Sequence, residues 1–161
     1  CQMTEQEQAE KTYHNILNLV WEFLTVKGAK INFENQLEKL EEIIPNVNDY
    51  DFFGVVPALD ACEALGELLH AIIAGETLEK AIQISQISLG TVCSLLETQE
   101  NRDLSEAELK TREEIEEELD LQWQIYRLLK DCEKRDVDLI LSLRNEIKQE
   151  GISNIGIKIE Q

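Results

Sequence analysis

The sequence predicts an all-α fold, a helical bundle of five or six helices with an extended C-terminal tail. Proline and glycine interrupt helices, and they number only 2 and 7 among the 161 residues. Apolar residues recur at spacings of three and four through most of the chain up to residue 150, which is the period of an amphipathic helix. With 43% apolar residues, residues 1–161 are long enough for one helical domain with its own core.

The first two helices are predicted on either side of a short connection. Helix 4–27 has an apolar stripe that contains Tyr13, Ile16, Leu17, Val20, Phe23 and Leu24. Gly28 suits its end, and Asn32 suits the cap of the next helix. Pro45 ends that second helix, because the residue before a proline avoids the helical conformation.

Two further helices follow an acidic and aromatic loop at residues 45–54. Pro57 suits the first turn of the third helix, where a missing N–H costs nothing, and Gly75 suits its end. Thr77 can cap the fourth helix. Gly90 lies inside that helix, where glycine is unfavourable, so we expect close helix packing around it.

The last helical region begins at a capping box formed by Ser105 and Glu108. The helical pattern then continues to residue 150 as one helix, or as two if the polar stretch 133–136 interrupts it. Gly151 suits its end. In the tail, Ile155, Ile157 and Ile159 alternate with other residues as in a strand, so we expect an extended segment that docks on the helices or on a second copy.

Charge and cysteine usage restrict the partners that we expect. The net charge is −18, and residues 100–120 carry ten acidic groups against three basic ones. Such a surface repels phosphates, so we expect no nucleic acid and no membrane as partners. The sequence has no run long and apolar enough to span a bilayer. The four cysteines form no paired metal-binding motif, which favours reduced thiols in a cytoplasmic protein and no cofactor.

Several stretches together resemble the YjaG-type family of uncharacterised bacterial cytoplasmic proteins. They are residues 21–45 (WEFLTVKGAKINFENQLEKLEEIIP), 54–62 (GVVPALDAC), 75–79 (GETLE), 119–129 (LDLQWQIYRLL) and 153–157 (SNIGI). The resemblance implies an all-helical protein and no particular activity or site. Members of that family begin with a further helical segment, so we expect the chain to lack an N-terminal helical segment.

The third predicted helix carries the strongest candidate for a metal site. Glu63, Glu67 and His70 share one helix face, and Glu67 and His70 have the Glu-x-x-His spacing of carboxylate-bridged di-iron proteins. Those proteins use two such motifs and two more carboxylates, whereas this sequence has a single Glu-x-x-His. A structural role on the protein surface is the alternative that the spacing leaves open.

A second candidate site is a polar cluster made by the third and last helices. Its residues are Asp60, Asp120, Gln122, Trp123 and Tyr126. They form either a ligand pocket or a buried network that fixes how the helices pack. Because no catalytic motif is present, we expect a non-enzymatic interaction protein with an acidic face, a homodimer or the partner of another protein. A bundle that binds a metal or small ligand through Glu63, Glu67 and His70 is the alternative.

Overall fold

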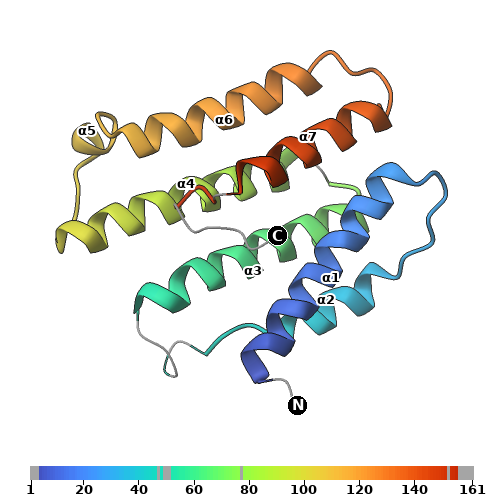
Figure 1. Ribbon diagram of the computed structural model, residues 1–161, viewed down its shortest axis with the longest axis horizontal. Coiled ribbons are helices and arrows are strands. Elements are labelled where there is room, and N and C mark those ends of the chain that lie inside the picture. The colour runs from blue at the N-terminus through green and yellow to red at the C-terminus, as the bar shows by residue number, and fades with distance from the viewer. Residues whose placement is uncertain (1–3, 47, 49–51, 77, 152, 156–161) are drawn as a thin grey trace. The chain divides into compact units, whose positions relative to one another are not determined.

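The computed structural model describes residues 4–46, 48, 52–76, 78–151 and 153–155. Its helices are α1 (Glu5–Thr25), α2 (Phe33–Glu41), α3 (Phe52–Ala74), α4 (Leu78–Glu100), α5 (Glu106–Leu109), α6 (Glu113–Leu129) and α7 (Val137–Glu150) (Figure 1). No strand occurs in these described residues, so the all-α prediction is confirmed. The chain divides within α4 into two compact units, residues 1–84 and 85–161, and each is described by itself.

Side-chain caps begin the first two helices. The Thr4 hydroxyl accepts a hydrogen bond from the Glu7 amide at 3.2 Å, and the Glu7 carboxylate accepts one from the Thr4 amide at 2.7 Å. Asn32 caps α2 as predicted, because its side-chain oxygen accepts from the Asn35 amide at 2.9 Å. Helix α1 ends at Thr25, earlier than predicted.

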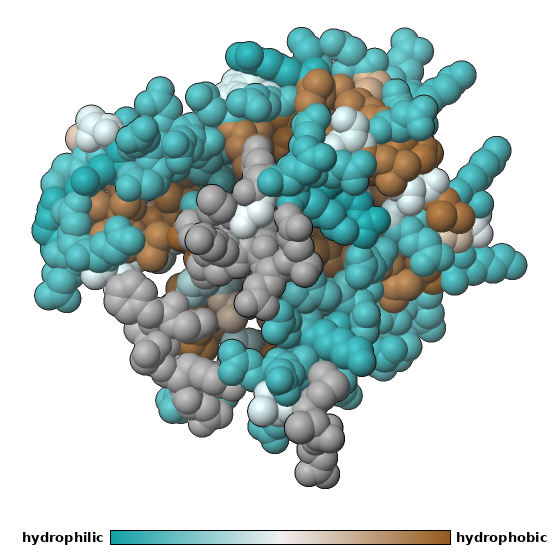
Figure 2. Space-filling view, viewed as in Figure 1, coloured by the Kyte–Doolittle hydropathy of each residue, from teal (hydrophilic) through white to brown (hydrophobic). Residues whose placement is uncertain are grey.

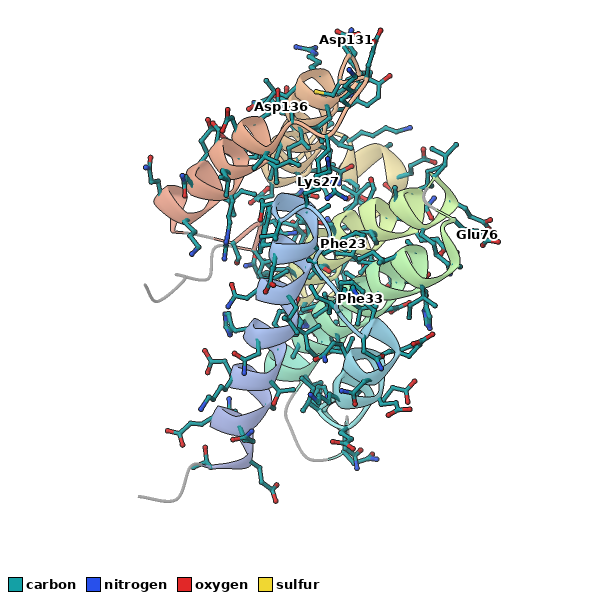
Figure 3. The ribbon with its side chains drawn as sticks, turned by 90° about the vertical axis from the view of Figure 1, so that its right-hand side faces the viewer. Phe23, Lys27, Phe33, Glu76, Asp131 and Asp136 are labelled. Carbon is teal, nitrogen blue, oxygen red and sulfur yellow. The ribbon has the colours of Figure 1, made fainter. Side chains whose placement is uncertain are left out.

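The core of the first unit is built from one face of each of α1, α2 and α3. Its buried residues are Ile16, Val20, Phe33, Leu40, Cys62, Leu65 and Leu69. The rings of Phe23 and Phe33 meet edge to face with centroids 5.3 Å apart, and Figure 3 shows the two side by side on α1 and α2. A Cβ placed on Gly66 would touch the Leu40 side chain at 3.7 Å, so α2 and α3 approach closely there. The apolar stripe predicted for the first helix is therefore the face of α1 that packs in this core.

A partly buried tyrosine, Tyr13, joins α1 to α3. The Tyr13 hydroxyl donates a hydrogen bond to the Ala61 carbonyl at 3.3 Å. Burial, the main cause, and the nearby Cys62 thiol together raise the pKa of Tyr13 to about 12. The folded state therefore favours the neutral phenol of Tyr13 over the phenolate.

The start of α3 differs from the prediction. The helix begins at Phe52, so Pro57 lies inside it instead of in its first turn. Thr77, the predicted cap of α4, lies outside the described residues, as do residues 47 and 49–51 of the predicted loop. Helix α4 runs through Gly90, and a Cβ added there would meet no atom within 4 Å. The expected close packing at Gly90 is therefore wrong.

The second unit contains α5, α6, α7 and the later part of α4. The Ser105–Glu108 capping box is present, but it opens the four-residue helix α5, and α6 begins separately at Glu113. Asp136 caps α7, so the region after residue 112 is two helices. Gly151 ends α7 in the left-handed conformation, with a φ of 62°, as glycine allows.

The core of the second unit is smaller than that of the first. Its buried residues are Val92, Leu96, Leu104 and Ile115, and Leu89, Cys93, Leu109 and Ile155 pack against them. Ile155 therefore docks on the helices of its own unit. Ile157 and Ile159, the rest of the predicted strand, lie outside the described residues. No helix in the described ranges combines the length and hydropathy of a membrane-spanning segment.

Candidate functional site

The three candidate metal ligands lie on α3, where Glu67 interacts mainly with a lysine. Lys80 of α4 donates a hydrogen bond to Glu67 Oε2, while His70 Nδ1 lies 3.7 Å from Glu67 Oε1. The Lys80 hydrogen bond is the main cause that lowers the pKa of the Glu67 carboxyl below its usual value. Glu63 is exposed. The ammonium of Lys80 therefore occupies the position beside Glu67 that a cation would need.

The geometry around these residues gives no further ligands. Among the residues that the structure describes, no group of three or more His, Cys, Asp or Glu side chains is arranged to hold a metal ion. The side chain of His70 is 49% exposed and that of Glu67 is 22% exposed. The arrangement is that of a salt bridge linking α3 to the first turns of α4.

The residues of the predicted polar cluster lie in different places, and Gln122 belongs to a packed network of the second unit. Its amide oxygen accepts a hydrogen bond from the Ser85 hydroxyl at 2.5 Å, and its amide nitrogen donates to Glu118 at 2.7 Å. Ser88 also donates to Glu118 Oε1 at 2.7 Å. Asn154 donates to the Ser88 hydroxyl at 3.0 Å. These bonds join α4, α6 and the segment after α7.

Glu118 is the central member of this network, and the sequence analysis missed it. The residue is only 5% exposed, and both of these donors to Oε1 are uncharged. Its burial could not be inferred from composition, because the Glu-rich run 113–120 predicts a solvated helix face. The available signal was its spacing, since Glu118 and Gln122 lie one turn apart on the same face as buried Ile115.

The other cluster residues lie elsewhere. Asp120 is exposed on α6, and Asp60 is half-buried on α3 in the first unit. Trp123 is 54% exposed and Tyr126 is 56% exposed. Because adjacent helix positions differ by about 100° in direction, Gln122 points into the second unit while Trp123 points outward. The network thus fixes the rotation of α6 and leaves its aromatic residues on the surface.

The outward row of α6 side chains is the candidate functional site, and we call it the α6 stripe. It consists of Glu116, Leu119, Trp123 and Tyr126 of α6 and of Lys130 at its C-cap, all of them exposed. Figure 2 shows apolar surface among hydrophilic residues near the upper edge of the view, where α6 runs. An exposed tryptophan and tyrosine on one helix face are unusual for surface positions and typical of binding sites.

The aromatic pair of the α6 stripe is already ordered by its neighbours. The rings of Trp123 and Tyr126 meet edge to face with centroids 5.5 Å apart. The Arg127 guanidinium lies over the Trp123 ring, 5.8 Å from its centroid. Side chains held in this way lose little conformational freedom when another surface covers them.

The acidic segment 100–120 is partly neutralised by its own arginines. Glu100 binds Arg112 and also Arg102, the latter at 2.8 Å. Arg102 also binds Glu108 at 2.8 Å. The hydrogen bonds from Arg102 and Ser105 lower the pKa of Glu108 to about 2. The end of α4 and helix α5 are therefore joined by a salt-bridge network, in which Arg102 and Arg112 lie beside Glu100 and Glu108.

Comparisons with known proteins identify the family. The family described as "Protein of unknown function (DUF416)" matches residues 1–158. An uncharacterized Haemophilus influenzae protein is 72% identical over all 161 residues, which cover 82% of its length. The uncharacterized Escherichia coli protein YjaG is 50% identical over the same 161 residues, again 82% of its length.

A solved structure agrees with the fold. A DUF416 family protein from Shewanella baltica, solved by crystallography, matches with a TM-score of 0.83 at 34% identity. The match covers 92% of this chain and 77% of that one. The resemblance to the YjaG-type family is thereby confirmed on sequence and on structure. This chain belongs to the DUF416 family.

Proposed function

We propose that this chain is a non-enzymatic, cytoplasmic interaction protein whose contact surface is the α6 stripe. The observation that supports the proposal is the exposure of Trp123 and Tyr126 on one helix face, at 54% and 56%. Tryptophan and tyrosine provide much of the binding free energy at protein interfaces. The acidic residues of α6 all lie in its first half, at positions 113–120, and make that end of the surface acidic.

The buried network supports the same proposal. Glu118 and Gln122 bind α4 through Ser88 and Ser85, so α6 cannot easily rotate to bury Trp123 in its own unit. An aromatic pair that stays exposed on a fixed helix is a preformed contact surface, and preformed surfaces bind at a lower entropic cost.

Photo-crosslinking in living cells tests this proposal. A benzophenone amino acid placed at Trp123 should form a covalent adduct with another protein chain. The same group at Gln124, an exposed neighbour about 100° around α6, should form markedly fewer adducts. Denaturing electrophoresis followed by mass spectrometry gives the yield and the identity of each adduct. Equal yields at the two positions, or none at Trp123, would contradict a contact surface at the α6 stripe.

The alternative proposal is a metal or small-ligand site at Glu63, Glu67 and His70. The one observation in its favour is the 3.7 Å approach of His70 to Glu67. We expect untagged protein to contain no stoichiometric metal, because Lys80 already neutralises Glu67. We also expect His70→Ala to change the free energy of unfolding by no more than about 0.5 kcal/mol, as surface substitutions do. Elemental analysis checks the first point, and stoichiometric metal lost in His70→Ala would favour the alternative.

A further inference from the structure

The α6 stripe repeats at the spacing of a helix–helix seam. Its residues follow one another at intervals of three, four, three and four positions, from Glu116 to Lys130. This heptad spacing keeps one row of side chains directed at a single partner helix. The row is apolar at its centre and charged at both ends. The α6 stripe therefore has the form of one half of a two-helix contact.

The order of charges along the α6 stripe is symmetric about Trp123 with the sign reversed. Glu116 lies seven positions before Trp123, and Lys130 lies seven positions after it. In two antiparallel helices related by a twofold axis at Trp123, position 116 of each copy lies opposite position 130 of the other. Both ends of the contact would then pair an acid with a base. Leu119 of each copy would lie opposite position 127 of the other copy, next to its Tyr126.

We infer that the α6 stripe binds a second copy of this chain through an antiparallel pair of α6 helices. This inference rests on the proposed function, because it requires the α6 stripe to be a contact surface. A parallel pair would place Glu116 opposite Glu116 and Lys130 opposite Lys130, and like charges that face each other oppose binding. In the antiparallel twofold pair, Glu116 of each copy is instead paired with Lys130 of the other copy.

The net charge of −18 opposes the association of two copies. At physiological salt, however, charges separated by more than about 8 Å are largely screened, so the charges near the seam decide the balance. There, Asp120 and Arg127 flank the seam as Glu116 and Lys130 end it, so each of these two acids lies near a base of the other copy, while Glu113, Glu114 and Glu117 keep the first half of the helix acidic. Trp123, held under Arg127, supplies apolar contact area at the centre.

Charge exchange at the two ends of the α6 stripe provides the test. Sedimentation equilibrium of the whole purified chain should show a dimer, and Glu116→Lys should weaken it about tenfold by placing two lysines opposite each other at both ends. Adding Lys130→Glu in the same chain should restore most of the affinity, because each pair is then re-formed with its signs exchanged. Circular dichroism confirms that each variant keeps its helix content.

Glu117→Lys is the matched control, because it makes the same change of net charge about 100° around the helix from position 116. Reduced repulsion alone would make both lysine variants associate more tightly than the wild type. The antiparallel pair instead predicts weaker association of the Glu116→Lys variant and no weakening of the Glu117→Lys variant. A monomeric wild type, a tighter Glu116→Lys dimer, or failure of the double exchange to restore affinity would each overturn the inference.

The two proposals fail in different ways. If the purified chain is monomeric but photo-crosslinks at Trp123 attach a different protein in cells, the second-copy inference is wrong and the contact surface stands. If neither association nor crosslinking occurs, both are wrong. If the crosslinked partner is the chain itself and Trp123→Ala weakens the dimer about a hundredfold, as loss of a central interface residue from both copies should, both are supported.

Discussion

Leu69→Ala should lower the free energy of unfolding by about 3 kcal/mol, the typical loss when a leucine in a packed core is cut back to alanine. Leu69 has no exposed surface and lies on the α3 face that the first-unit core shares with α1 and α2. Removal of its side chain leaves a cavity that helices fixed by the Tyr13–Ala61 hydrogen bond can fill only in part. Urea denaturation followed by circular dichroism measures the change.

Leu78→Ala is the control for this prediction. It deletes the same atoms from a leucine that is 75% exposed on α4. We expect it to change the free energy of unfolding by no more than about 0.5 kcal/mol. Equal effects of the two substitutions would contradict the placement of Leu69 in the core.

Glu118→Ala should lower the free energy of unfolding by about 2 kcal/mol, because it leaves two partly buried donors without their acceptor. The substitution removes the hydrogen bonds from Ser88 and Gln122 to a carboxylate that is 5% exposed. Part of this loss is offset because the variant no longer has to bury a carboxylate. The same denaturation measurement applies.

Glu117→Ala provides the comparison, since Glu117 precedes Glu118 on α6 and is exposed. Its expected change is within about 0.5 kcal/mol. The difference between the two variants tests directly whether the acidic run 113–120 is entirely solvated, as its composition indicates, or has one carboxylate inside the fold. Glu118→Ala as stable as Glu117→Ala would contradict the buried network.

The helix ends that could be predicted are those with a local chemical cause. Asn32 and the Ser105–Glu108 pair act through hydrogen bonds within three residues, and Gly151 acts through its own backbone conformation. The start of α3 was missed because the sequence argument gave Pro57 the one position where proline costs nothing, whereas the observed helix includes it. Tertiary packing determines where such a helix begins, and a single sequence does not reveal that packing.

Two residues of the α6 stripe, Trp123 and Tyr126, were singled out from the sequence, but not their arrangement. Gln122 and Trp123 were placed in one cluster because they are adjacent in the sequence. Helix α6 has apolar residues on several sides, including the exposed Leu121 and Leu128, so periodicity alone did not determine which side is buried. The α4 partner of Gln122, Ser85, lies 37 positions away in the chain, beyond the reach of a local pattern.

The charge order of α6 also acts on the helix itself. Its N-cap residue, Arg112, makes no side-chain capping hydrogen bond, and the first turn instead carries Glu113, Glu114 and Glu116, while Arg127 lies in the last turn. Acids at the N-terminal end and bases at the C-terminal end oppose the partial charges of the peptide dipoles and stabilise the helix. The charges that would align two copies therefore also stabilise α6 in each separate copy. A substitution that reverses the order of these charges would weaken both the proposed contact and the helix that presents it.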